Sequence, residues 1–124
     1  MTKVIKFDLQ DRLIGYAVRI IKLAEALPNT PTGKHIGKQI LRSGTSPAPN
    51  YGEAQSAEST SDFIHTLKIA LKELRETEVW LKIIIKSELI TPKDKIDPLL
   101  KETDELISIL FSSVQTARNN KIKE

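Results

Sequence analysis

The chain has 124 residues and a net charge of +3, with 40% hydrophobic and 28% charged residues. This composition is typical of a globular protein with one core, so we expect a single domain over residues 1–124 and no extensive disorder. The absence of cysteine excludes disulfides, thiol catalysis and cysteine-ligated zinc, and suits a reducing cytoplasm. Charges interrupt the N-terminal segment and the longest apolar run, Ile83–Ile85, is short, so we expect a cytoplasmic protein with no signal peptide and no membrane partner.

The first predicted helix covers residues 8–27, because strand signals are almost absent and apolar residues recur there every three or four positions. Asp8 is suited to cap its first turn, since a carboxylate accepts hydrogen bonds from free backbone N–H groups. The sequence LPNTPTG, residues 27–33, contains the prolines and glycine of a loop and is expected to end this helix.

A second helix is expected over residues 34–57, with two prolines in its middle. Pro47 and Pro49 each lack the N–H that would bond to the carbonyl four residues earlier, and each ring crowds that carbonyl. We therefore predict a proline kink that serves packing, because the small residues around it let a neighbouring helix approach closely. Asn50 and Glu53 are the polar residues of this narrow surface, and we expect them in a buried polar network and not in a catalytic pair.

The third and fourth helices are predicted over residues 60–88 and 92–118. Thr91 and Pro92 have the residue types of a helix cap and a first helical position, and residues 119–124 are expected to fray. Apolar and small residues at heptad spacing form the seam of the third helix: Phe63, Leu67, Ala70, Leu74, Thr77, Leu81 and Ile84. Short connections make successive helices antiparallel, so we predict an all-α fold, an up-and-down antiparallel four-helix bundle with a proline kink in helix two.

The middle of the chain resembles a known protein family. The residues that carry the resemblance are Arg42-Ser43, Ser46, Asn50, Glu53-Ala54 and then DFIHTLKIALKELRETEVWL from Asp62 to Leu81. In this order they resemble the small four-helix proteins encoded within intervening sequences of bacterial 23S ribosomal RNA genes. The resemblance extends over nearly the whole chain, including the LPNTPTG segment.

The resemblance implies a four-helix subunit that assembles with itself into a homopentameric ring. It also implies kinship with the accessory variability protein of diversity-generating retroelements, a basic pentameric barrel that binds nucleic acid and a reverse transcriptase. The family has no established enzymatic activity, so the resemblance implies architecture more directly than function.

Candidate catalytic and metal sites are weak. His35 and His65 are the two histidines, and Asp62 precedes His65 by one helical turn, a spacing used in di-iron bundles. Such sites need a second motif of this kind and further carboxylates, which the sequence lacks. No arginine has a histidine four to six residues after it, as in helical ribonucleases of toxin systems, and no glycine-rich phosphate loop is present. We therefore expect no enzymatic activity, no catalytic residues, no metal and no cofactor.

The charged segment KELRETE, residues 72–78, allows two interpretations. It is either a solvated helix face with stabilising charge pairs, or part of a network in which the acids meet Arg42 or Asn50 across helices or subunits. We favour the network for Glu76 and leave Glu73 open. Trp80 lies beside the heptad seam, as a second core contact or as an anchor between subunits. The predicted polar network or interface comprises Arg42, Asn50, Glu53, Glu76 and Trp80.

Basic residues are the remaining binding feature, since residues 1–58 carry the whole positive excess. Helix periodicity places them on one side of each of the first two helices: Arg12, Arg19 and Lys22, and Lys34, Lys38 and Arg42. If the two helices are antiparallel neighbours, these residues form one patch that contacts phosphates of RNA or DNA. The alternative is a charged face that only maintains solubility. The leading hypothesis is an oligomer that binds structured nucleic acid, and the competing one is a scaffold that binds a protein partner.

Overall fold

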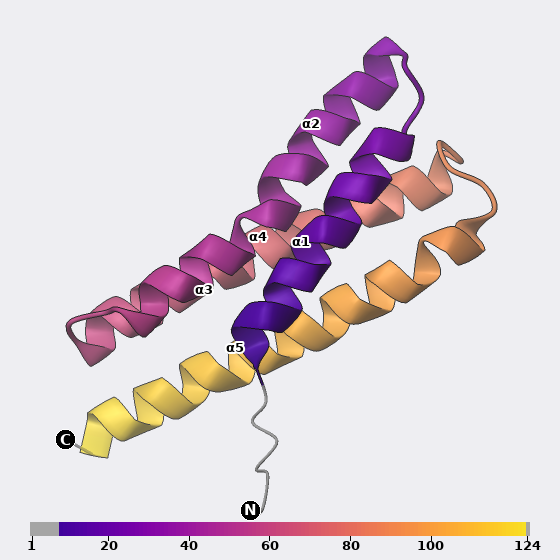
Figure 1. Cartoon of the computed structure of the whole chain (residues 1–124). Coiled ribbons are helices and arrows are strands. Elements are labelled where there is room, and N and C mark those ends of the chain that lie inside the picture. The colour runs from indigo at the N-terminus through magenta and orange to yellow at the C-terminus, as the bar shows by residue number, and fades with distance from the viewer. Residues whose placement is uncertain (1–7, 124) are drawn as a thin grey trace, which may run out of the picture.

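The computed structural model describes residues 8–123. Within this range the elements are α1 (Leu9–Ala26), α2 (Pro31–Thr45), α3 (Pro47–Gln55), α4 (Thr60–Lys86), the 3₁₀ helix η1 (Lys93–Lys95) and α5 (Asp97–Lys123) (Figure 1). The described residues contain no strand, and the predicted all-α fold is confirmed. No helix among them is long and apolar enough to cross a membrane.

The helices pack lengthwise around one apolar core. The long helix α4 contacts α2, α3 and α5, and α1 contacts α2, α3 and α5. In Figure 1 the chain reverses direction between α1 and α2, between α3 and α4, and between α4 and α5, while α3 continues the course of α2. Fully buried side chains of this core include Ile20, Ile40, Leu67, Leu74, Leu81, Ile84, Leu106 and Leu110.

Side-chain caps explain where the first helices begin. The Asp8 carboxylate accepts a hydrogen bond from the Asp11 N–H at 3.0 Å, as predicted for the first helix. The Thr30 hydroxyl accepts from the Gly33 N–H at 3.1 Å, and Pro31 is the first residue of α2. The expected start at residue 34 is therefore wrong, because a Thr-Pro pair inside the predicted loop caps the helix three residues earlier.

The predicted second helix is divided in two at Ser46. This residue keeps right-handed helical backbone angles, with φ −66° and ψ −36°, and its N–H still bonds to the Arg42 carbonyl at 3.2 Å. The next positions lose hydrogen bonds because Pro47 and Pro49 have no N–H to donate. The Ser46 hydroxyl donates to the Arg42 carbonyl at 2.6 Å, and the Asn50 N–H bonds to the Ser46 carbonyl at 3.1 Å. These bonds hold the chain on a helical path across the break.

The start and the end of the last helix differ from the prediction. Pro92 follows a cis peptide bond and precedes η1, and α5 begins only at Asp97. Pro98 takes a first-turn position in which its missing N–H leaves no bond unmade. At the other end the helix continues to Lys123, beyond the predicted end at residue 118, and residue 124 lies outside the described part.

The predicted seam of the third helix is buried along most of its length. Leu67, Ala70, Leu74, Thr77, Leu81 and Ile84 of α4 are fully buried. Phe63 at the start of the seam is only half-buried. In α5 Ser113 is likewise half-buried, while Val114 and Ala117 are buried. The buried face of each helix therefore departs from a strict heptad at single positions.

Candidate interaction surfaces

Arg42, in the last turn of α2, joins that helix to α4 through two carboxylates. Its Nη1 donates to Glu73 at 2.9 Å and its Nη2 donates to Glu76. The indole N–H of Trp80 also donates to Glu76, at 3.0 Å, and the His35 ring meets the Trp80 ring edge-on with centroids 6.2 Å apart. Of the two partners expected for Glu76, Arg42 and Asn50, it is Arg42 that meets this carboxylate, within one chain, and Glu73 takes part as well.

Beneath this charged cluster lies a small buried polar contact. The Thr77 hydroxyl oxygen is 2.8 Å from the Ser43 hydroxyl and 2.8 Å from the carbonyl oxygen of Glu73. Both hydroxyl residues are fully buried, and each has a hydrogen-bond partner, as burial of a polar group requires. The cluster around Arg42 therefore fixes how α2 lies on α4.

Asn50 and Glu53 do not reach this network. Both lie on α3, beyond the break at Ser46, where Asn50 is half-buried and Glu53 is exposed. Among the described residues, no hydrogen bond or salt bridge joins either side chain to Arg42, Glu76 or Trp80. The buried positions of α3 belong to Pro47, Ala48 and Ala54, so α3 packs through small apolar groups and its polar residues lie to the side.

Arg12 is held by acidic residues of α5. Its guanidinium donates from Nε to Glu102 at 2.8 Å and from Nη2 to the other oxygen of Glu102 at 2.7 Å, with a further contact to Glu105 at 3.2 Å. Hydrogen bonding to Arg12 lowers the pKa of Glu102. This fork geometry makes Arg12 a link between α1 and α5, and its charge is already compensated.

The remaining predicted basic residues fall on two sides of α1. Arg19 and Lys22 line a groove of about 260 Å³ with Lys95, and the other residues around it, Leu23, Ala26, Ile90 and Leu99, are apolar. Lys34 and Lys38 border a different groove between α1 and α2. All four are exposed, and no salt bridge among the described residues engages them. The expected single patch is therefore divided into two basic regions.

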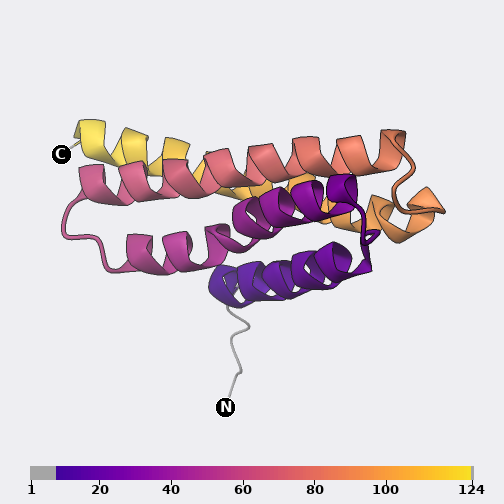
Figure 2. The same ribbon diagram turned by 90° about the horizontal axis from the view of Figure 1, so that it is seen from above.

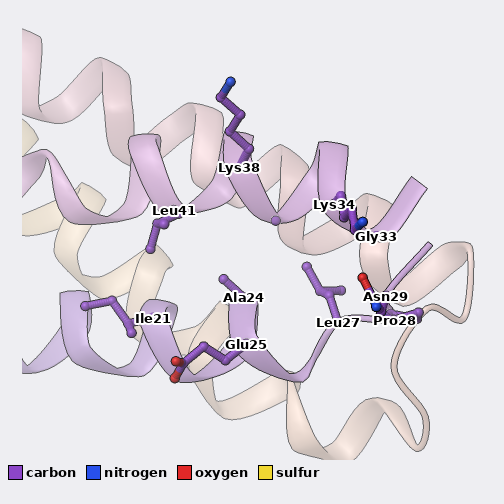
Figure 3. Close-up of a pocket in the computed structure, with 11 residues that line it drawn as sticks. Ile21, Ala24, Glu25, Leu27, Pro28, Asn29, Gly33, Lys34, Lys38 and Leu41 are labelled. Atoms are coloured by element: carbon purple, nitrogen blue, oxygen red, sulfur yellow. The ribbon is translucent and has the colours of Figure 1, made fainter. Parts of the chain in front are cut away.

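The groove between α1 and α2 has a volume of about 590 Å³ and an apolar floor (Figure 3). Figure 3 shows Ala24, Leu27 and Leu41 directed into the space between the helices, while the Lys38 side chain extends away from it. The helices approach closely at Gly37, where an added Cβ would lie 3.4 Å from a Leu27 methyl. Polar and charged residues, among them Glu25, Asn29 and Lys34, line the groove around this apolar floor.

Two polar contacts of the structure were not predicted from the sequence. Tyr16 is fully buried, and its hydroxyl lies 2.6 Å from that of Thr103, so burial raises the pKa of Tyr16. Glu78 of α4 shares a hydrogen bond with Asp104 of α5, which raises the pKa of Glu78. The partners of each pair lie on different helices, so no spacing within the sequence indicates them.

Exposed apolar side chains gather on two outer faces. On α1 they are Ile14, Val18 and Ile21, and Leu41 of α2 lies next to Ile21 at the groove. On α4 they are Ile69, Val79 and Ile83. A further large apolar residue, Phe111, is exposed on α5. Monomeric proteins rarely expose contiguous apolar faces, so these are candidate contact surfaces.

A sequence model of the 23S rRNA-intervening sequence proteins matches residues 6–112. The chain belongs to this family. Among solved structures it is similar to a protein of unknown function from the S23 ribosomal protein family of Bacteroides thetaiotaomicron, with 40% sequence identity and a TM-score of 0.80. That similarity covers 86% of this chain and 98% of the other. A search of curated proteins gave no match.

The histidine and acidic side chains of this chain are the remaining candidates for a metal site. No three His, Cys, Asp or Glu side chains of the described residues are gathered as metal ligands. Asp62 and His65 are both exposed in the first turns of α4, where Asp62 suits the positive end of the helix dipole.

Proposed function

We propose that this protein is a non-enzymatic subunit of a homo-oligomer, with five copies in the ring that the family resemblance implies. The observation that supports this proposal is the pair of exposed apolar faces on α1 and α4. Burying such faces against another copy removes apolar surface from water, which is the main driving force of association. The core of one chain is already complete without them, so they are available for a second molecule.

Light scattering after size exclusion tests the assembly directly. The expected mass is five times the 13.9 kDa of one chain. A particle of one chain mass across the micromolar range would overturn the proposal. An assembly with another number of copies would support self-association and contradict the number five.

A second candidate function, binding of structured RNA or DNA, is favoured by the groove of Arg19, Lys22 and Lys95. No carboxylate is among the residues that line it, and none of its three cations forms a salt bridge within the described residues. Lysine and arginine contact phosphates without reading base sequence, and a ring repeats such a groove once per copy. Arg12 and Arg42 are less suited to this role, because each is already bound to two carboxylates.

Binding of a structured RNA at several salt concentrations tests this function. We expect affinity that falls steeply as salt rises, and that Arg19→Ala/Lys22→Ala loses most of it while remaining assembled. A matched control is Lys101→Ala/Arg118→Ala, which removes the same charge from exposed positions of α5. If the assembled wild type binds no RNA or DNA, the nucleic-acid proposal fails and the scaffold for a protein partner takes its place.

A further inference from the structure

The outer face of α1 has a regular order of residues. Asp11, Ile14, Val18, Ile21 and Glu25 follow one another in steps of three, four, three and four, and all are exposed. Three apolar side chains thus form the middle of a straight seam, and an acid stands at each end. This spacing is that of a helix that packs lengthwise on another helix.

The outer face of α4 has a seam of the same length and the opposite end charges. Lys72, Glu76, Val79, Ile83 and Lys86 follow in steps of four, three, four and three. Val79 and Ile83 are exposed, Val79 by 55%. The carboxylate of Glu76 is already held by Arg42 and Trp80, so the net charge that this seam offers is that of its two lysines.

Gly15 beside the α1 seam packs against no side chain of residues 8–123. A Cβ built at this position meets no atom within 4 Å, in contrast to Gly33 and Gly44. A glycine inside a helix costs about 1 kcal/mol relative to alanine. The missing side chain of Gly15 leaves room beside Ile14 and Val18. A helix of another molecule could use this room to approach closely, which would give the glycine a function.

We infer that the α1 seam of one copy packs lengthwise on the α4 seam of the next copy. The inference rests on the proposed self-assembly and assigns its two contact faces. Val18 and Val79 are the central residues of their seams, so they face each other whether the two helices run parallel or antiparallel. The acids Asp11 and Glu25 then lie opposite Lys72 and Lys86 at both ends, again in either direction. Charge complementarity and equal seam length thus select a second copy as the occupant.

The positions of the two seams permit a closed assembly. Figure 2 places α1 and α4 along opposite edges of the molecule. The two faces differ, so each copy holds one neighbour through α1 and another through α4. Such a head-to-tail contact generates a closed ring when the rotation from each copy to the next adds up to a full turn.

Cysteine cross-linking tests which faces meet, since the natural chain has no cysteine. In the double variant Val18→Cys/Val79→Cys, mild oxidation should give a ladder of covalent oligomers up to the full assembly, and neither single variant should give one. The matched control is Val18→Cys/Phe111→Cys, which uses an exposed apolar residue of α5 instead. An assembled protein that cross-links through position 111, or through neither pair, overturns the face assignment and leaves self-assembly intact. A monomeric protein overturns both.

Charge reversal gives an independent measurement on residues outside the core. Asp11→Lys/Glu25→Lys and Lys72→Glu/Lys86→Glu should each raise the concentration at which the assembly dissociates, by about tenfold or more. Combining the four substitutions should restore assembly, because the end charges are again opposite. If the combined variant assembles no better than the separate ones, these seams do not face each other.

Discussion

Tyr16 and Thr103 show how one buried hydrogen bond links the first and last helices. The Thr103 hydroxyl donates to the Leu99 carbonyl at 2.8 Å, so its single proton is used there and Tyr16 is the donor in the 2.6 Å contact. Tyr16→Phe removes this donor and should lower the free energy of unfolding by about 1 kcal/mol. Thr103→Val leaves the tyrosine hydroxyl buried without an acceptor and should cost more, roughly 1–3 kcal/mol.

The two substitutions are expected to be non-additive, because either one removes the same contact. Urea denaturation of the single and double variants at one fixed protein concentration measures the coupling. A double variant whose loss equals the sum of the single losses would show that the hydroxyls do not stabilise each other.

Glu78 and Asp104 are expected to oppose folding at neutral pH. The hydrogen bond to Asp104 and partial burial raise the pKa of Glu78 above its ordinary 4.5. A folded-state pKa that is raised favours the folded state at low pH, and this contribution is lost as pH rises through the folded value. Asp104→Asn should therefore stabilise the protein at neutral pH, by on the order of a few tenths of a kcal/mol.

The stabilisation should shrink as the pH falls below 4.5, where Glu78 is protonated in the unfolded chain as well. Unfolding free energies of wild type and variant across this range give the comparison. An equal difference at both ends of the range would mean that Asp104 is not the cause of the raised pKa of Glu78.

At the scale of the elements, Arg12 and Glu102 fasten α1 to α5. The pKa of Glu102 is lowered in the folded protein, so its contribution to stability is present above the ordinary 4.5 and is lost as pH falls through the lower folded value. Arg12→Gln should destabilise the protein by ~1 kcal/mol at neutral pH and reduce its sensitivity to acid. Arg19→Gln, on the same helix but without a salt bridge among the described residues, is the control. An equal effect of both substitutions would contradict a specific role for the Arg12 fork.

The connection between α1 and α2 depends on Gly33. A Cβ at this position would lie 1.9 Å from the backbone carbonyl oxygen of Pro28, which has no flexible end that could move aside. Gly33→Ala should therefore lower stability by roughly 2 kcal/mol or more. Gly37→Ala, four residues further along α2, would meet a Leu27 methyl at an ordinary 3.4 Å and should be tolerated. Thermal unfolding of both variants compares them, and similar midpoints would show that the connection relaxes to accept the new methyl group.

Helix existence was predictable from the sequence, and helix boundaries were predictable only where a local cap decides them. Periodicity indicated all the long helices, and Pro47 and Pro49 indicated the break at Ser46. Thr91-Pro92 and Asp97-Pro98 offer similar local start signals. Ile96, which is fully buried, stands directly before the start that the chain uses, so tertiary packing and not local propensity distinguishes them.

Site residues were less predictable, because charge partners lie far apart in the sequence. Arg12 pairs with a glutamate 90 positions later, so periodicity placed it in a basic patch that it does not join. The exposed apolar residues of α1 lie between two groups of cations, Arg19 with Lys22 and Lys34 with Lys38. A prediction made helix by helix places all four cations in one patch. Glu76 was expected to meet Arg42 or Asn50 because of its place in the family pattern, and the structure gives Arg42 as its partner.

At the scale of the whole molecule, folding and assembly are expected to be coupled. A native state that is oligomeric and an unfolded state that is monomeric are related by mass action, so the melting temperature should rise with protein concentration. Val18→Glu/Val79→Glu places an acid at the centre of both seams without touching the core, since both residues are exposed. Its melting temperature should be lower than that of wild type and independent of concentration. Differential scanning fluorimetry over a hundredfold dilution series measures the melting temperatures of wild type and variant. If the melting temperature of the wild type does not change with concentration, the stability of this bundle does not depend on its assembly.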